Sequence, residues 1–154
     1  MTLHKLLAAV AASGVLVTTA WSADYQITRS LQLKQPTADV WRMAGGFCDI
    51  DDWHPGFIAC EVKAVEGTLH RVLTTNSGET FVDQRIAREP GLSYTYKSVQ
   101  SQLPVDSFVA TFSVEPNDGS QVTWSVDFSS EDPAMEAKVI DLIETGLAGI
   151  EDSF

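Results

Sequence analysis

Apolar and polar residues alternate through most of the chain with a period of two, which is typical of half-buried β-strands. The alternating stretches are separated by clusters of Gly, Pro, Asn, Asp, Ser and Glu that form turns. Because short turns join consecutive strands, the pattern predicts one antiparallel sheet of seven strands. The predicted strands cover residues 25–35, 57–65, 68–75, 80–88, 92–100, 106–114 and 121–128.

The last three predicted strands are strongly one-sided. Aromatic and aliphatic residues occupy alternate positions, and Ser, Thr, Lys or Asp lie between them. One face of the sheet is therefore expected to be buried and aromatic, and the other face hydrated. The residues of the buried face are Tyr94, Tyr96, Phe108, Ala110, Phe112, Val114, Val122, Trp124, Val126 and Phe128.

A helical period replaces the alternation after the first strand and again near the C-terminus. Thr37 is a candidate cap for a short helix that Gly45 and Gly46 end, and a second short helix precedes Pro55. Asp132, followed by proline, is expected to start a long amphipathic helix. Its apolar face consists of Met135, Val139, Leu142, Ile143, Gly146, Leu147 and Ile150.

The only large apolar surface available to this C-terminal helix is the aromatic face of the sheet. We therefore expect an α+β fold: a seven-stranded antiparallel sheet curled around a long C-terminal helix, with two short helices after the first strand.

The N-terminus has the features of a secretory signal peptide. Lys5 supplies a positive charge, and an uncharged apolar run follows it that is too short and too rich in small residues to span a bilayer comfortably. We expect cleavage after Ser22, with Ala20 as the second choice. Residues 1–22 are then the signal peptide and residues 23–154 a single domain. The mature protein would be periplasmic or secreted, without stable membrane association.

Removal of Lys5 with the signal peptide changes the formal net charge from −11 to −12. An acidic surface of this kind repels nucleic acid and anionic membranes. It is compatible with a partner of a basic protein, although simple solubility also explains it. The sequence contains no nucleophile motif, phosphate-binding loop or dinucleotide fingerprint. We expect no cofactor.

Residues 48–60, CDIDDWHPGFIAC, are dense in residues that bind metals or react. The aspartates do not follow the calcium-loop pattern, because Trp53 stands where an oxygen ligand is needed and His54 replaces the glycine. The spacing of Cys48, His54 and Cys60 is unlike that of zinc ligands. We therefore expect no metal. In an oxidising compartment the two cysteines can form a disulfide, and the alternative is a pair of buried thiols.

With this order of elements, residues 38–62, 94–116 and 119–128 resemble the START-like or SRPBCC superfamily of helix-grip proteins. The resemblance is strongest to its polyketide cyclase/dehydrase branch, which includes periplasmic accessory proteins of methanol oxidation (MxaD-like). Members of the superfamily enclose a cavity between the sheet and the C-terminal helix that holds sterols, lipids, hormones, polyketides or other apolar compounds. The resemblance implies a pocket for a small apolar ligand and does not imply one reaction.

Such a pocket would be lined by the aromatic face of the sheet and the apolar face of the C-terminal helix. Trp53 and His54 would reach its mouth from the turn before Pro55. For His54 we favour a packed corner instead, because a lone histidine rarely catalyses without an orienting partner. The ligand-binding residues are expected to be Trp53, His54, Phe81, Asp83, Arg85, Tyr94, Tyr96, Phe108, Phe112, Trp124, Leu142, Gly146 and Leu147.

Asp83 and Arg85 lie two residues apart on one predicted strand and therefore share a face. If that face lines the cavity, the two are a polar anchor for a ligand and, with Tyr96, the candidate catalytic residues. If it points outward, they are a solvated pair. Apolar residues occupy both alternations of this strand, so the pattern leaves the two options open.

Three functions are compatible with the sequence. We favour the binding of a small apolar or aromatic ligand. A cyclase or dehydratase would use Asp83, Arg85 and a tyrosine as general acid and base, but export argues against it because activated polyketides are made in the cytoplasm. The third is a non-enzymatic accessory role with a periplasmic redox protein, a quinoprotein dehydrogenase, as partner.

Overall fold

The computed structural model describes residues 21–154, so the predicted signal peptide lies almost entirely outside the described residues. The secondary structure elements follow the predicted order. They are β1 (Ala23–Leu33), α1 (Thr37–Ala44), α2 (Ile50–Trp53), β2 (Phe57–Val65), β3 (Thr68–Thr75), β4 (Thr80–Glu89), β5 (Ser93–Gln100), β6 (Asp106–Pro116), β7 (Ser120–Ser130) and α3 (Met135–Glu151).

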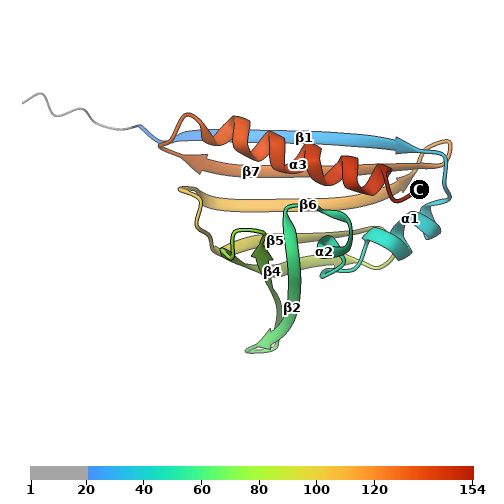
Figure 1. Cartoon of the computed structure of the whole chain (residues 1–154), viewed down its shortest axis with the longest axis horizontal. Coiled ribbons are helices and arrows are strands. Elements are labelled where there is room, and N and C mark those ends of the chain that lie inside the picture. The colour runs from blue at the N-terminus through green and yellow to red at the C-terminus, as the bar shows by residue number, and fades with distance from the viewer. Residues whose placement is uncertain (1–20) are drawn as a thin grey trace, which may run out of the picture.

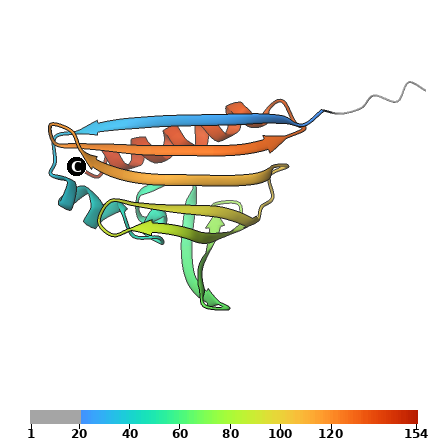
Figure 2. The same cartoon turned by 180° about the vertical axis from the view of Figure 1, so that it is seen from behind.

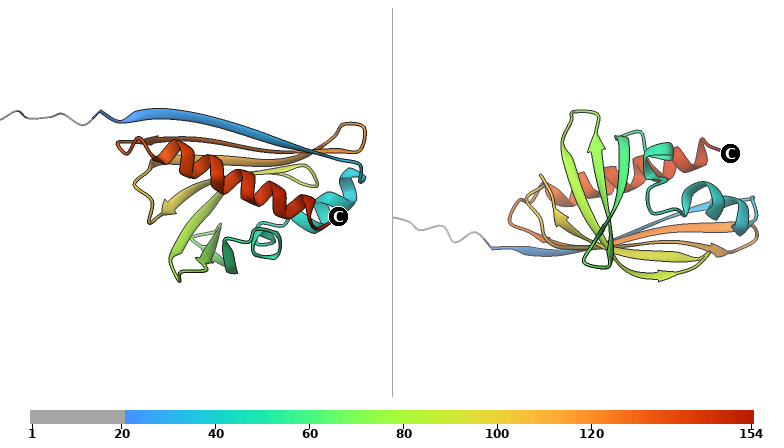
Figure 3. Two further views of the ribbon diagram at one scale, coloured as in Figure 1. Left: turned by 45° about the horizontal axis from the view of Figure 1, so that its top comes forward. Right: turned by 90° about the horizontal axis from the view of Figure 1, so that it is seen from below.

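All seven strands form one antiparallel sheet in the order β1-β7-β6-β5-β4-β3-β2. Neighbours in sequence pair from β2 to β7, and β1 pairs with β7. Helix α3 crosses one face of the sheet beside β1 and β7 (Figure 1), and Figure 2 shows the sheet from behind. The strands β2, β3 and β4 turn out of the plane of the others and rise beside the helix (Figure 3). The predicted helix-grip α+β fold is confirmed.

The core lies between the concave face of the sheet and the helices. Burial alternates strictly along the first half of β7, and the inward side chains Val122, Trp124 and Val126 are almost completely buried. Phe112 of β6 stacks on Tyr94 of β5. On α3 the buried residues are Met135, Val139, Ile143, Gly146, Leu147 and Ile150. These are six of the seven residues of the predicted apolar face; the seventh, Leu142, is half-buried. Burial of this face holds the helix against the sheet.

The starts of two helices differ from the prediction. Thr37 does not cap α1: Pro36 occupies the N-cap position, and the Thr37 hydroxyl lies 3.5 Å from that of Ser120. Asp132 accepts a hydrogen bond from the amide of Ala134, so its carboxylate stabilises the turn before α3, and the helix itself begins three residues after it.

Two glycines let α3 approach the corner between α2 and β2. A Cβ atom on Gly149 would overlap the carbonyl oxygen of Trp53, and one on Gly146 would lie 2.7 Å from Cδ2 of His54. Contacts this short are not available to larger residues. The glycines therefore fix how closely the C-terminal helix packs on this corner.

Candidate functional site

A cavity of about 180 Å³ lies between the concave face of the sheet and α3. Most of its wall is aromatic or aliphatic. The residues that line it are Ile50, Gly56, Phe57, Arg71, Leu73, Thr75, Phe81, Asp83, Tyr96, Ser98, Ser101, Leu103, Phe108, Trp124, Lys138 and Leu142. A second hollow of about 130 Å³ adjoins it and shares Ser98, Ser101, Leu103 and Phe108.

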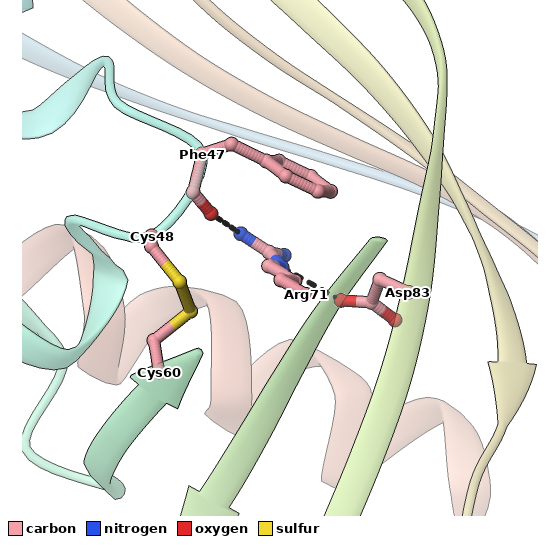
Figure 4. Close-up of a disulfide and its surroundings, with 5 residues drawn as sticks. All are labelled: Phe47, Cys48, Cys60, Arg71 and Asp83. Atoms are coloured by element: carbon pink, nitrogen blue, oxygen red, sulfur yellow. Dashed lines mark hydrogen bonds and ion pairs between the residues drawn. A yellow bond between two sulfur atoms is a disulfide. The ribbon is translucent and has the colours of Figure 1, made fainter. Parts of the chain in front are cut away.

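The cavity wall contains a buried ion pair between Arg71 of β3 and Asp83 of β4. The Nε atom of Arg71 donates to Oδ2 of Asp83 at 2.9 Å, and the two residues are 1 % and 5 % exposed (Figure 4). They are directly opposite each other in the β3–β4 pairing, as are Leu73 and Phe81. Because opposite residues of a pair point to the same face, the hairpin places both charges on the concave side.

Arg71 is also held from other directions. Its Nη1 atom donates to the carbonyl oxygen of Phe47 at 2.8 Å. Its guanidinium carbon lies 4.6 Å from the ring centroid of Phe47 and 4.5 Å from that of Tyr96, both within cation–π range. Cys48, the next residue after Phe47, forms a disulfide with Cys60 of β2, with their Cα atoms 5.4 Å apart (Figure 4). The disulfide ties the segment that carries this carbonyl to the sheet.

Burial and charge act in opposite directions on this pair. Burial raises the pKa of the Asp83 carboxyl, and the adjacent Arg71 guanidinium limits that rise. Burial alone would lower the pKa of Arg71, but the Asp83 carboxylate and the hydroxyls of Tyr94 and Tyr96 raise it above its usual value. Arg71 therefore stays charged, and the pair is a fixed dipole in an otherwise apolar wall.

Tyr96 brings a hydroxyl group to the same wall. Its oxygen accepts a hydrogen bond from Nε1 of Trp124 at 3.2 Å. Burial raises the pKa of Tyr96 well above its usual value. The hydroxyl therefore keeps its proton at neutral pH and can act as a hydrogen-bond donor.

His54 is fully engaged in packing rather than in the cavity wall. It is 2 % exposed; its Nδ1 accepts from the amide of Gly56 at 3.0 Å, and Nε2 lies 2.9 Å from the carbonyl oxygen of Leu142. Since Nδ1 is an acceptor, Nε2 carries the proton and donates to Leu142. Burial lowers the pKa of His54. The structure thus places His54 in a packed corner, the alternative that we favoured.

Trp53 packs beneath the cavity and does not line it. Its ring stacks on Phe112 with centroids 5.8 Å apart and meets Trp124 edge to face. The indole Nε1 is buried without a hydrogen-bond partner. The predicted position at the pocket mouth is not the one that the structure shows, because stacking on the inner face of β6 draws the ring into the core.

The predicted site residues separate into two groups. The cavity wall includes Phe81, Asp83, Tyr96, Phe108, Trp124 and Leu142. The core around it includes Trp53, His54, Tyr94, Phe112, Gly146 and Leu147, which are buried but do not line the cavity. Arg85 is half-buried on the same face as Asp83, and its guanidinium carbon lies 5.8 Å from the Phe47 ring. Asp83 pairs with Arg71 and not with Arg85.

Sequence reasoning missed Arg71, which the alternation on β3 could have identified. Leu69, Arg71 and Leu73 share one face of this strand, and Leu73 is buried. In the structure Thr75 bonds Glu79 across the turn and Thr74 pairs with Thr80, and counting back from these pairs places Arg71 opposite Asp83. A turn of four residues, 76–79, would have placed Gln84 there, so the sequence marks the face of Arg71 but not its partner. The loop that supplies Ser101 and Leu103 gave no comparable signal.

Within residues 21–154, no group of three or more His, Cys, Asp or Glu side chains is arranged to hold a metal ion. In the same part of the chain, no helix is long and apolar enough to cross a membrane.

The chain belongs to the polyketide cyclase/dehydrase and lipid transport family, whose model matches residues 24–154. This family has the helix-grip fold of the SRPBCC superfamily. The matched region contains all of the strands and helices described above apart from the first residue of β1. A comparison with curated proteins found no match.

Solved structures with the same fold include proteins from bacteria and plants. The protein XoxI from Bacillus cereus is 26 % identical, with a TM-score of 0.76 over 84 % of this chain and 94 % of that chain. An aromatase/cyclase from a Streptomyces species is 15 % identical, with a TM-score of 0.63 over 84 % and 92 %. A major latex-like protein from Panax ginseng is 18 % identical, with a TM-score of 0.62 over 84 % and 97 %. The last two similarities are similarities of fold alone.

Proposed function

We propose that the protein is an exported binding protein that holds one small, mainly apolar molecule between the sheet and α3. The observation that carries the proposal is the cavity of about 180 Å³ with its aromatic and aliphatic wall. An engineered apolar cavity of about 150 Å³ is large enough to bind benzene. The volume therefore fits a single ring with a small substituent.

The same wall supports binding in preference to acid–base turnover. Catalysis by a cyclase or dehydratase would require Asp83 and Arg85 in the cavity beside a proton donor. Arg71 engages Asp83 instead, and Arg85 does not line the cavity. Tyr96 holds its proton because burial raises its pKa. The lining thus contains one carboxylate, Asp83, which Arg71 holds in place, and no histidine or second carboxylate to exchange protons with it.

A titration of the purified chain with toluene and phenol, followed by NMR of the backbone amides, tests the binding function. We expect shifts confined to residues around the cavity. Ser98→Phe places a ring inside the cavity and should abolish binding, whereas Lys97→Phe, on the exposed side of the same strand, should leave it unchanged. Failure of both probes to bind the unaltered chain would refute the proposal.

Export belongs to the same proposal and is tested separately. The signal peptide that the sequence predicts and the Cys48–Cys60 disulfide both fit an oxidising compartment. Expression of the full chain in a bacterium should give a mature protein that begins at Ala23 in the periplasm or the medium. Recovery of the unprocessed chain in the cytoplasm would contradict export.

An MxaD-like accessory role is a second candidate, favoured by the charge of α3. Its exposed acidic side chains Glu136, Asp141, Glu144 and Glu151 outnumber Lys138, the one basic residue of the helix. A basic partner surface would complement them, and salt would weaken such a complex. Sedimentation of the protein with the quinoprotein dehydrogenase of its own organism at low ionic strength should give a complex; two independent species would exclude this role.

A further inference from the structure

Two polar groups of the cavity wall, the Asp83 carboxylate and the Tyr96 hydroxyl, keep hydrogen-bonding capacity that the described residues do not use. Oδ2 of Asp83 accepts from Arg71, but no donor among the described residues bonds to Oδ1. The Tyr96 oxygen accepts from Trp124, but no acceptor in residues 21–154 takes the Tyr96 hydroxyl proton. Both side chains line the cavity. Polar groups in such surroundings are normally paired, so these two are available to a ligand.

The two groups lie close enough to engage one ligand group. Asp83 is opposite Ser98 and Tyr96 is opposite Arg85 in the β4–β5 pairing, so Asp83 and Tyr96 are diagonal neighbours on the concave face. Both also contact Arg71: Asp83 through the 2.9 Å hydrogen bond, and Tyr96 through its ring, 4.5 Å from the guanidinium carbon. The acceptor Asp83 and the donor Tyr96 thus lie on either side of Arg71. Together they fit a ligand group that both donates and accepts a hydrogen bond.

Charge around the cavity favours a neutral ligand. The guanidinium of Arg71 is offset by Asp83 inside the wall. Lys138 has a 57 % exposed side chain at the mouth and lies 3.7 Å from the carboxylate of Asp132. A carboxylate ligand would approach the free oxygen of Asp83 with no unpaired cation to compensate, and its burial would be costly.

We infer that the cavity selects an uncharged one-ring compound that carries a hydroxyl group, which donates to Oδ1 of Asp83 and accepts from the hydroxyl of Tyr96. The inference rests on the proposed binding function and names the chemical class of its ligand. A cavity with an apolar wall alone would disfavour a hydroxyl, because burial without a partner costs free energy. Selection for the hydroxyl is therefore a property of Asp83 and Tyr96.

Calorimetric titration of the purified chain with phenol, toluene and benzoate tests this selection. Phenol should bind at least tenfold more tightly than either of the others, although toluene is the more apolar molecule. Tyr96→Phe should weaken the preference for phenol over toluene, because it removes the donor and leaves the Asp83 acceptor in place. Tyr94→Phe is the matched control for an effect transmitted through Arg71, because Tyr94 lies two residues away on β5, is 4 % exposed and interacts with Arg71, but does not line the cavity.

The possible results test the binding function and the selection for a hydroxyl group separately. If no probe binds, the binding function itself is wrong. If toluene or benzoate binds as tightly as phenol, the cavity is real but hydroxyl selection is refuted. If Tyr94→Phe weakens the preference as much as Tyr96→Phe does, Tyr96 is not the donor. The comparison of the three probes on the unaltered chain needs no variant, so it decides the matter even if Tyr96→Phe does not fold.

Discussion

The hydrogen bonds of a buried side chain can fix its protonation state, and His54 is the example in this protein. His54 must accept from Gly56 through Nδ1 and donate to Leu142 through Nε2, and only the neutral imidazole can do both. A second proton on Nδ1 would break the first of these bonds and place a charge in the core. The lowered pKa of His54 agrees with this requirement, because burial disfavours the charged imidazolium.

The free energy of unfolding should therefore depend on pH through His54. Its pKa is lower in the folded chain than the usual 6.5, so the unfolded state binds a proton first as the pH falls. Stability from this residue is complete above about pH 6.5 and decreases as the pH falls through the folded pKa, by at most about 1.4 kcal/mol per pH unit. Urea unfolding at several pH values measures the slope.

Two substitutions separate His54 from other titrating groups. His54→Gln keeps a neutral donor near Leu142 and should flatten the slope below pH 6.5. His70→Gln changes a half-buried histidine on β3 that bonds only its neighbour Thr68, and it should leave the slope in place. A slope that survives His54→Gln would assign the pH dependence to other residues.

At the residue level, the sequence predicted which polar side chains belong to the site better than it predicted which of them pair. Asp83 was identified as a cavity residue on one of two possible faces, and its partner was sought two positions along the same strand. The partner is Arg71 on the neighbouring strand, because residues two apart on one strand are separated by about 7 Å, whereas directly opposite residues are only about 5 Å apart. Packing of His54 was anticipated, whereas the stacking of Trp53 on Phe112 depends on three-dimensional contacts that no spacing reveals.

At the scale of elements, the strands were predictable because each alternates over many residues between clear turns. The predicted strands at 57–65 and 68–75 coincide with β2 and β3. Helix starts were less predictable, since Thr37 and Asp132 both have capping chemistry but bond elsewhere. The cavity loop at residues 101–105 has no periodic pattern, and its contribution to the wall is set by tertiary packing alone.

The packing of α3 against the Trp53–His54 corner leads to a prediction for Gly149. Alanine is the better helix former by about 1 kcal/mol. Gly149→Ala should nevertheless lower the free energy of unfolding, by about 1–3 kcal/mol, because its Cβ would overlap the carbonyl oxygen of Trp53. Ala148→Gly, at an exposed neighbouring position, reports helix propensity without that overlap. A Gly149→Ala variant more stable than the unaltered chain would show that the helix is free to move away.

For the whole molecule, the disulfide joins the α1–α2 segment to the sheet. Cys48 and Cys60 are 12 residues apart, and closing a loop of about this size restricts the unfolded chain. The double substitution of both cysteines by Ala should cost about 3 kcal/mol of unfolding free energy. Chemical denaturation with and without a reductant measures it: the reductant should destabilise the unaltered chain and leave the double variant unaffected. If, without reductant, the unaltered chain and the double variant had the same free energy of unfolding, this role would be contradicted.

The β3–β4 hairpin has a consequence for how the sequence can vary. Exposed turns usually tolerate insertions. Between Arg71 and Asp83, however, an extra residue that the loop does not absorb shifts the register by one, and a shift of one reverses the face on which a side chain lies. One charge would then remain buried without its partner. Substitutions at residues 76–79 should therefore be accepted during divergence, while changes of length should be rare, and the length of this turn serves as a marker for relatives that retain the ion pair.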